Sequence, residues 1–313
     1  MSLTVKNLTK KYSDKVVVDN LSFEINEPGV YALLGTNGAG KTTTLRIILG
    51  MLASNGGEVL WKGKPLNAVE ANVGYLAEER GLYPKYSLLD QLLYFAKLRN
   101  VPKKEAMSRI KYWSERLQVN EYVFPAKTKG RKVSKAHRAE QLSKGNQQKI
   151  QLMATLISDP ELIILDEPLS GLDPVNTDLF KSIIREEISK NKYLIMSSHQ
   201  MPTIEEFCSD ITILNRGKAI LQGNLNEIKK SYGRVNLFVK CDIDIASYIS
   251  DFNLTIVNKT PSEYHLKVQG EEEAMTFLGK LIEDKVPLVK FELREPSLHE
   301  IFVEKVGDTH EEK

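Results

Sequence analysis

A glycine-rich segment that ends in a lysine and two threonines carries the residue types best suited to chemistry in this chain. It consists of Gly35, Thr36, Asn37, Gly38, Ala39, Gly40, Lys41, Thr42 and Thr43. The glycines let the backbone bend tightly, so that successive N–H groups can turn inward and bind phosphate oxygens. Lys41 adds positive charge for the β- and γ-phosphates, the Thr42 hydroxyl is placed to ligate Mg²⁺, and Thr43 can donate to the α-phosphate. The segment therefore predicts a site for a nucleoside triphosphate.

The sequence on both sides of this segment suits such a site. The apolar run from Val30 to Leu34 precedes it and is typical of a buried strand, and residues 45–49 continue as a helix. The loop would then open a helix, whose N-terminal N–H groups favour negative charge. A chance match to the pattern G-x-x-x-x-G-K-[ST] is therefore a poor explanation.

A second apolar strand, residues 162–165, ends in the two carboxylates Asp166 and Glu167. Asp166 can hold Mg²⁺ through water, while Glu167 can orient and deprotonate an attacking water. Only a hydrolase of nucleoside triphosphates needs both groups. Chance acids at a strand end would be the simpler reading if Lys41 were absent.

His199 follows the β-rich run at residues 193–196. A single histidine at a strand end is more often structural than catalytic. Its position after the carboxylate strand favours a contact with the γ-phosphate instead. Glu167 and His199 are therefore the predicted catalytic residues.

A second potential anion site precedes the carboxylate strand. In residues 141–150, Ser143 and Gly145 open a helix whose backbone donors are free, although no lysine accompanies them in the manner of Lys41. Asp173 follows the carboxylates in the segment 170–174.

The composition fits a soluble globular protein, and the basic and acidic residues nearly balance. The chain has 313 residues, with 43 basic and 41 acidic side chains and a net charge of +2, so charge alone does not argue for nucleic acid or an anionic membrane. No apolar run reaches the roughly 20 residues that cross a bilayer, and the N-terminus lacks the apolar stretch of a signal peptide. We therefore expect a cytoplasmic protein. Its two cysteines, Cys208 and Cys241, lack metal-ligand spacing.

Residues 1–225 alternate short β-rich runs with helical patterns, which is typical of an α/β domain with a mostly parallel sheet. Residues 85–158 are almost wholly helical, which predicts an inserted helical subdomain. A linker is expected at 226–233. Residues 234–305 then follow the order β-α-β-β-α-β of a small α+β, ferredoxin-like domain, and 306–313 form a tail.

These motifs, in this order, resemble the ATP-binding subunits of ABC transporters. The glycine-rich segment matches the Walker A motif, residues 162–167 match the Walker B, and residues 170–173 match the D-loop. His199 matches the switch histidine, and residues 142–146 match the signature LSGGQ. Tyr12 lies where an aromatic ring stacks on adenine. The likeness covers residues 3 to about 222 and implies a P-loop NTPase core with an N-terminal antiparallel β subdomain.

The C-terminal segment that ends at residues 294–302 resembles the small appended domain of exporter-type ATPases, such as sodium and drug efflux subunits.

Two motifs depart from the family pattern, at three positions in all. The signature has Lys144 and Asn146 where glycine and glutamine are usual, and an added positive charge near phosphate should not abolish binding. Glu78 takes the place of the Q-loop glutamine. A carboxylate still ligates Mg²⁺, but it cannot donate a hydrogen bond and it adds negative charge, so hydrolysis would be slowed or coupled differently. The alternative is that Glu78 merely lies in a surface loop.

The resemblance implies that two chains act together, head to tail. ATP with Mg²⁺ would lie between Lys41, Thr42 and Asp166 of one chain and Ser143 and Gly145 of another, which is a second copy or a related ATPase. A separate multipass membrane permease subunit would carry the cargo, an ion, drug or peptide, and would hold the chain at the inner face of the cell membrane.

Two alternative functions remain beside that of a transporter ATPase. A soluble ABC-type ATPase on ribosomes or DNA would generally carry two nucleotide domains or a long coiled coil, and neither is present. A regulatory module with feeble turnover is suggested only by Glu78.

A basic run lies at residues 127–138, just before the signature. Such a run is usually a solvated loop, but it could face anionic lipid or an acidic partner. Nucleic acid is not expected, because no aromatic residues interleave with the charges.

Overall fold

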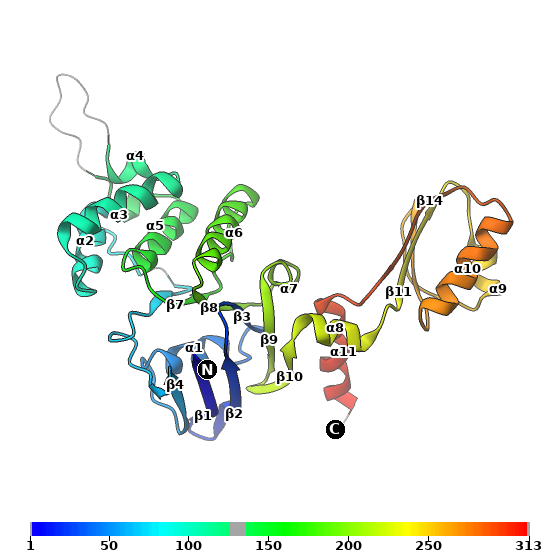
Figure 1. Ribbon diagram of the computed structural model, residues 1–313, viewed down its shortest axis with the longest axis horizontal. Helices are drawn as coiled ribbons and strands as arrows, with labels where there is room; N and C mark the ends of the chain where they lie inside the picture. The colour runs from blue at the N-terminus through cyan, green and yellow to red at the C-terminus, as the bar shows by residue number, and fades with distance from the viewer. Residues whose placement is uncertain (1, 80, 126–135, 312–313) are drawn as a thin grey trace. The chain divides into compact units, whose positions relative to one another are not determined.

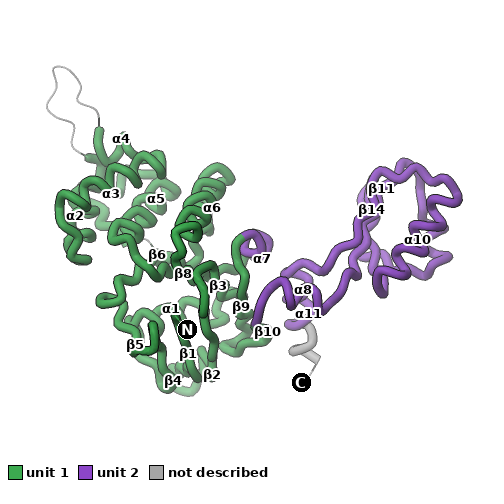
Figure 2. Tube along the Cα trace, viewed as in Figure 1, with its two compact units in different colours: residues 1–200, 207–222 green, residues 201–206, 223–313 purple. Residues whose placement is uncertain are grey.

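The computed structural model describes residues 2–79, 81–125 and 136–311, and for residues 307–311 it describes the backbone alone. The chain divides into two compact units, shown in different colours in Figure 2. The first unit comprises residues 1–200 and 207–222, and the second comprises residues 201–206 and 223–313. Among the described residues, no helix is both long enough and apolar enough to cross a bilayer.

An antiparallel sheet forms the N-terminal part of the first unit, with the strand order β2-β1-β4-β5. Its strands are β1 (Leu3–Tyr12), β2 (Lys15–Ile25), β4 (Gly56–Trp61) and β5 (Lys64–Pro65). In β2 the buried residues Leu21, Phe23 and Ile25 alternate with exposed polar ones. This period of two places one face of the strand against the core.

A six-stranded sheet lies at the centre of the first unit, with the order β10-β9-β3-β8-β7-β6 (Figure 1). Its strands are β3 (Gly29–Gly35), β6 (Gly74–Leu76), β7 (Leu162–Asp166), β8 (Tyr193–Ser198), β9 (Cys208–Asn215) and β10 (Lys218–Asn224). The pairs β3/β8, β3/β9, β6/β7 and β7/β8 are parallel. All five residues of β7 are buried, as expected for a strand covered on both faces. The carboxyl ends of β3, β7 and β8 therefore meet at one edge of the sheet.

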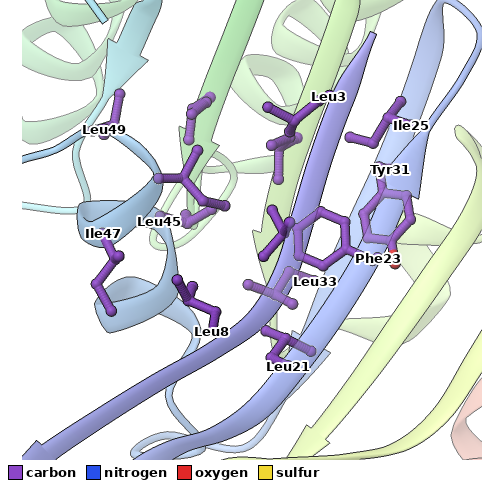
Figure 3. Close-up of a cluster of buried hydrophobic side chains, with 14 of the residues drawn as sticks. Leu3, Leu8, Leu21, Phe23, Ile25, Tyr31, Leu33, Leu45, Ile47 and Leu49 are labelled. Carbon is purple, nitrogen blue, oxygen red and sulfur yellow. The ribbon is translucent and has the colours of Figure 1, made fainter. Parts of the chain in front are cut away.

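A hydrophobic core joins the two sheets to α1 (Lys41–Ile48), the helix that follows β3. Figure 3 shows side chains from β1, β2, β3 and α1 gathered in this cluster, Phe23, Leu33 and Leu45 among them. Phe23 and Tyr31 stack with their ring centroids 4.7 Å apart. This packing fixes the position at which β3 turns into α1.

The predicted helical subdomain lies between β6 and β7. It contains α2 (Leu88–Leu98), α3 (Lys103–Arg116), α4 (Asn120–Val123), the 3-10 helix η1 (Ala139–Gln141) and α5 (Lys144–Leu156). In α3 the residues Ala106, Ile110 and Trp113 are buried at helical spacing. After β7, the helix α6 (Pro174–Ser189) begins with proline in its first turn, where the missing N–H costs nothing.

The second unit contains a four-stranded sheet with the order β12-β13-β11-β14. Its elements are β11 (Asn236–Cys241), α9 (Ala246–Asp251), β12 (Thr255–Lys259), β13 (Glu263–Lys267), α10 (Glu271–Glu283) and β14 (Leu288–Arg294). This is the predicted β-α-β-β-α-β order. A separate core, which includes Leu237, Leu266 and Phe277, holds the sheet against its two helices.

Three further helices belong to the second unit: α7 (Met201–Ile204), α8 (Leu225–Tyr232) and α11 (Leu298–Glu311). The segment 226–233, expected as a linker, is largely the helix α8, because Asn224 caps its first turn by accepting from Asn226 N–H and Glu227 N–H. α11 extends to Glu311, beyond residue 305, where the accessory domain was expected to end.

Candidate active site

The glycine-rich loop connects β3 to α1, and at two of its positions only glycine fits. Gly40 is the residue before α1 and has φ 107°, in the left-handed region. A Cβ added at Gly40 would lie 2.6 Å from the carbonyl oxygen of Val17. At Gly35, with φ 151°, an added Cβ would lie 2.4 Å from the Leu214 carbonyl oxygen. Any larger residue would push the loop away from its neighbours.

Lys41 is held inside this loop. Its Nζ donates to the carbonyl oxygens of Gly35 at 2.8 Å and of Thr36 at 3.2 Å. It also lies 3.3 Å from Glu167 Oε1, and both side chains are only 6% exposed. The loop backbone thus holds the lysine beside the carboxylate that directly follows β7.

Asp166 ends β7 and meets α1 and β8. Its Oδ1 accepts from Ser197 Oγ at 2.6 Å and from Thr42 Oγ1 at 3.2 Å. Ser197 faces it directly, because the parallel register of β7 and β8 pairs these two residues. The first carboxylate is therefore fixed beside the hydroxyl that was predicted to ligate Mg²⁺.

The backbone of Glu167 has a φ of 49°, which residues other than glycine rarely adopt. Its N–H donates to Ser197 Oγ at 3.0 Å, which helps to hold this conformation. Backbone strain of this kind is found at functional sites, where the surroundings enforce it.

His199 lies beside the second carboxylate. Its Nδ1 is 2.9 Å from Glu167 Oε2. Glu167 thus contacts Lys41 through one oxygen and His199 through the other. The two predicted catalytic residues are in direct contact.

A pocket of about 230 Å³ opens over the loop. Among the described residues it is lined by Val17, Asn37, Gly38, Gly40, Lys41, Thr42, Thr43, Glu78 and Glu167. This lining combines backbone donors, a lysine and two threonine hydroxyls with two carboxylates, which suits a phosphate chain bound with a cation.

The donor set also fits Mg²⁺. Asp166 Oδ2 is buried and has no hydrogen-bond partner among the described residues, and Thr42 Oγ1 lies beside the same carboxylate. Carboxylate and hydroxyl oxygens are the ligands that Mg²⁺ prefers. A buried carboxylate oxygen without a partner is costly, and a cation would remove that cost.

Glu78 follows β6 and is one of the residues that line the pocket. Its placement there is what the Q-loop reading requires. In the surface-loop alternative, Glu78 would have no part in the pocket chemistry.

Tyr12, the predicted adenine contact, is the last residue of β1 and is 49% exposed. Lys10 Nζ lies 5.0 Å from the centroid of its ring. Tyr12 does not line the phosphate pocket.

Within one chain, the signature residues Ser143 and Gly145 lie outside the phosphate pocket. Ser143 caps α5 by accepting from Asn146 N–H at 3.3 Å, and an added Cβ at Gly145 would lie 3.2 Å from Asn176 Nδ2. Asp173 caps α6, and the hydrogen bond from the Asn176 N–H lowers the pKa of its carboxyl. Neither Ser143 nor Gly145 is among the described residues that line the phosphate pocket.

Sequence reasoning assigned no role to Ser197 or Val17. Ser197 bridges Asp166 and Glu167, and a serine at the end of the strand beside the carboxylate strand is the signal that could have revealed it. Val17 contributes through its backbone, which no residue type could signal.

Most of the basic run 127–138 lies outside the described residues.

The fold and the site together define a P-loop ATPase, in which the glycine-rich loop after β3 faces the carboxylates at the end of β7, with β8 between the two parallel strands. A family model described as ABC transporter matches residues 18–170, and one described as ATP-binding protein DrrA1-3-like, C-terminal domain, matches residues 223–306. The chain is 42% identical over 310 residues to the ABC transporter ATP-binding protein YhaQ of Bacillus subtilis, covering 99% of this chain and 100% of that one. The protein belongs to the ATP-binding proteins of ABC transporters.

Two further likenesses agree with this family. The linearmycin resistance ATP-binding protein LnrL of Bacillus subtilis is 27% identical, over 98% of this chain and 99% of the relative. A solved structure of the ATP-binding subunit of an ABC transporter superimposes with a TM-score of 0.64 at 24% identity, covering 74% of this chain and 93% of that one. The latter likeness supports the fold. As a member of this family the protein binds ATP and is an ATPase that acts in transport.

Proposed function

We propose that this protein powers a membrane export complex by binding ATP between two chains, with the Walker A loop of one facing the signature of the other. One observation carries the proposal. The phosphate pocket is lined by Lys41, Thr42 and Glu167, whereas Ser143 and Gly145 are not among its lining residues. Each chain thus offers half of a site, which a head-to-tail dimer completes.

The chemistry follows from the contacts of Glu167. This carboxylate acts as the base that deprotonates the attacking water, while His199 contacts the γ-phosphate and orients Glu167. Lys41 exchanges its contact with Glu167 for the β- and γ-phosphates, which leaves the base available to water. Thr42 and Asp166, which are joined by a hydrogen bond, would hold Mg²⁺ together with Glu78, which lines the same pocket as Thr42. The cation neutralises phosphate charge when bound.

The partner is a separate multipass permease subunit, which holds the chain at the inner, cytoplasmic face of the cell membrane. A groove of about 390 Å³ between α2, α5 and β6 offers a docking surface, and we call it the subdomain groove. Met51 and Leu98 line it, and they are 64% and 56% exposed. Exposed apolar side chains that line one groove support a contact with another protein, because such groups gather at interaction surfaces.

The cargo is proposed to be an ion, a drug or a peptide that is moved outward. The likeness to a linearmycin resistance protein and to a DrrA-type C-terminal domain favours the export direction.

A mixing experiment tests the shared site. The Lys41→Ala and Ser143→Trp variants are each expected to hydrolyse little ATP alone. In an equal mixture half of the dimers pair the two variants and contain one intact site, so about a quarter of the parental rate should return. If activity did not return, the shared site would be wrong.

Membrane binding tests the partner. Leu98→Glu should release the protein from membranes of its own cells in a sedimentation assay, whereas Val69→Glu, at a position that is 68% exposed, should not. Equal sedimentation of both variants would contradict the subdomain groove as the permease contact.

A further inference from the structure

The short segment after His199 belongs to the second compact unit, although both of its neighbours in the chain belong to the ATPase core. Residues 201–206 group with residues 223–313, whereas residues up to 200 and 207–222 form the first unit. Glu205 follows His199 by six residues. The predicted γ-phosphate contact is therefore joined by a few residues of chain to a segment packed in the other unit.

Within the second unit, Glu205 links this segment to two helices. Its Oε1 accepts a hydrogen bond from the Leu298 N–H, the first N–H of α11, and lies 3.7 Å from Lys229 Nζ of α8. α7 also packs directly against α11. Met201 and Ile204 of α7 are buried, as is Leu298. A carboxylate at a helix N-terminus is favourable both as a hydrogen-bond acceptor and as a charge.

The first residues of α11 are also connected to the four-stranded sheet of the second unit. Ser297 and Glu300 form a reciprocal cap, with Ser297 N–H donating to Glu300 Oε2 at 2.7 Å and Glu300 N–H donating to Ser297 Oγ at 3.2 Å. The other oxygen of Glu300 accepts from Asn236 Nδ2 at 3.0 Å. Asn236 is 2% exposed and is the first residue of β11. Glu205 and the sheet of the second unit are thus connected through the first turn of α11: Leu298 donates to Glu205, and its chain neighbour Ser297 pairs with Glu300, which accepts from Asn236.

We propose that Glu205 is a positioning residue for His199 and that it couples the accessory domain to the ATP site. By holding the start of α11, Glu205 fixes the segment 201–206 and with it the backbone that follows His199. A shift of His199 on nucleotide binding is passed to α11, and a partner that displaces α11 shifts His199 in return, since such coupling is reciprocal. The inference rests on the proposed role of His199 at the γ-phosphate.

Kinetics of the full-length protein test this role. Glu205→Ala should lower kcat about fivefold, because one charge-assisted hydrogen bond is lost. ATP affinity, measured in a Glu167→Gln background, should stay within about twofold, because the phosphate pocket is untouched. Glu205→Gln should restore most of kcat, since its amide oxygen can still accept from the Leu298 N–H. Glu227→Gln, an exposed position on α8, is the matched control and should behave as the parent.

Hydrogen exchange provides a readout that a merely structural role would not move. Adding ATP to the Glu167→Gln protein should slow exchange of the amides at 298–302, and adding Glu205→Ala should abolish that response. Unchanged exchange at 298–302 on ATP addition, or a parental kcat in Glu205→Ala, would overturn the coupling. If Glu205→Ala did not fold, the response of Glu167→Gln alone would decide.

The same assays separate this inference from the proposed function. Loss of turnover in His199→Ala and Glu167→Gln together with parental turnover in Glu205→Ala would overturn the coupling alone. Parental turnover in Glu167→Gln or His199→Ala would instead overturn the assigned catalytic residues.

Discussion

Lys41 Nζ and Glu167 Oε1 lie 3.3 Å apart, and each of the two side chains is only 6% exposed. A buried lysine beside a buried carboxylate is the element of the site that a triphosphate must rearrange, because the phosphates compete with Glu167 for the same cation.

Lys41→Ala should therefore weaken ATP binding about 100-fold or more, because the phosphates lose their buried positive partner. Isothermal titration or a fluorescent ATP analogue would measure this. Lys62→Ala is the matched control, since Lys62 pairs with Glu161 at the surface, where the side chains are 53% and 47% exposed. Parental affinity in Lys41→Ala would refute the assigned phosphate contact.

Ser197→Ala should destabilise the protein by about 2 kcal/mol, because one buried hydroxyl serves both Asp166 and the Glu167 N–H. Turnover should fall as well, since the backbone at Glu167 loses the contact that holds its positive φ. Urea unfolding and phosphate release measure the two effects. Ser189→Ala, at an exposed position, should change neither, and an unaltered unfolding midpoint in Ser197→Ala would contradict the bridging role.

Glu78→Gln should raise the rate of phosphate release several-fold. Glu78 and Glu167 line the same pocket, and replacing one carboxylate by an amide removes a negative charge near the phosphates and supplies a donor. Steady-state phosphate release at saturating ATP would show the increase. A rate equal to that of the parent would return Glu78 to the role of a surface-loop residue.

The stability of the second unit should depend on pH through Glu300. Burial alone would raise the pKa of this carboxyl, but the hydrogen bonds from Ser297 outweigh it and the pKa lies below its usual value. A lowered pKa in the folded state stabilises the protein above the unfolded-state pKa of about 4.3. That stabilisation is lost as the pH falls through the folded-state pKa.

Glu300→Gln should therefore be less stable than the parent near pH 7, and the difference should shrink as the pH falls toward 3. Urea unfolding followed by circular dichroism at several pH values measures it. Glu304→Gln, at an exposed position of α11, is the control. A difference between parent and Glu300→Gln that did not vary with pH would contradict the assignment.

Periodicity and local motifs were enough to predict the α/β class, the P-loop NTPase core, the helical subdomain and the β-α-β-β-α-β order of the accessory domain. They predict elements whose apolar residues repeat over one face, such as α3 and β2. The grouping of residues 201–206 with the C-terminal unit could not be predicted in this way. It depends on tertiary contacts of α7 and Glu205 with α11, which lies far away in sequence, and no local pattern records these.

The site shows the same division. Lys41, Thr42, Asp166, Glu167 and His199 were predicted from their motifs, and the structure brings them together. Ser197 was missed, because its role arises from the register of two parallel strands rather than from its own motif. The roles of these five residues toward nucleotide remain predictions, as do those of Tyr12, Ser143, Gly145 and Asp173.

The most direct measurement of the central claim is gel filtration of the Glu167→Gln protein with and without ATP and Mg²⁺, combined with phosphate release. Without its base the site should still bind ATP, so the variant should elute at twice the mass of one chain when ATP is present and release no phosphate. A protein that stayed monomeric with ATP bound, or that hydrolysed ATP at the parental rate, would contradict the shared site and the assignment of Glu167.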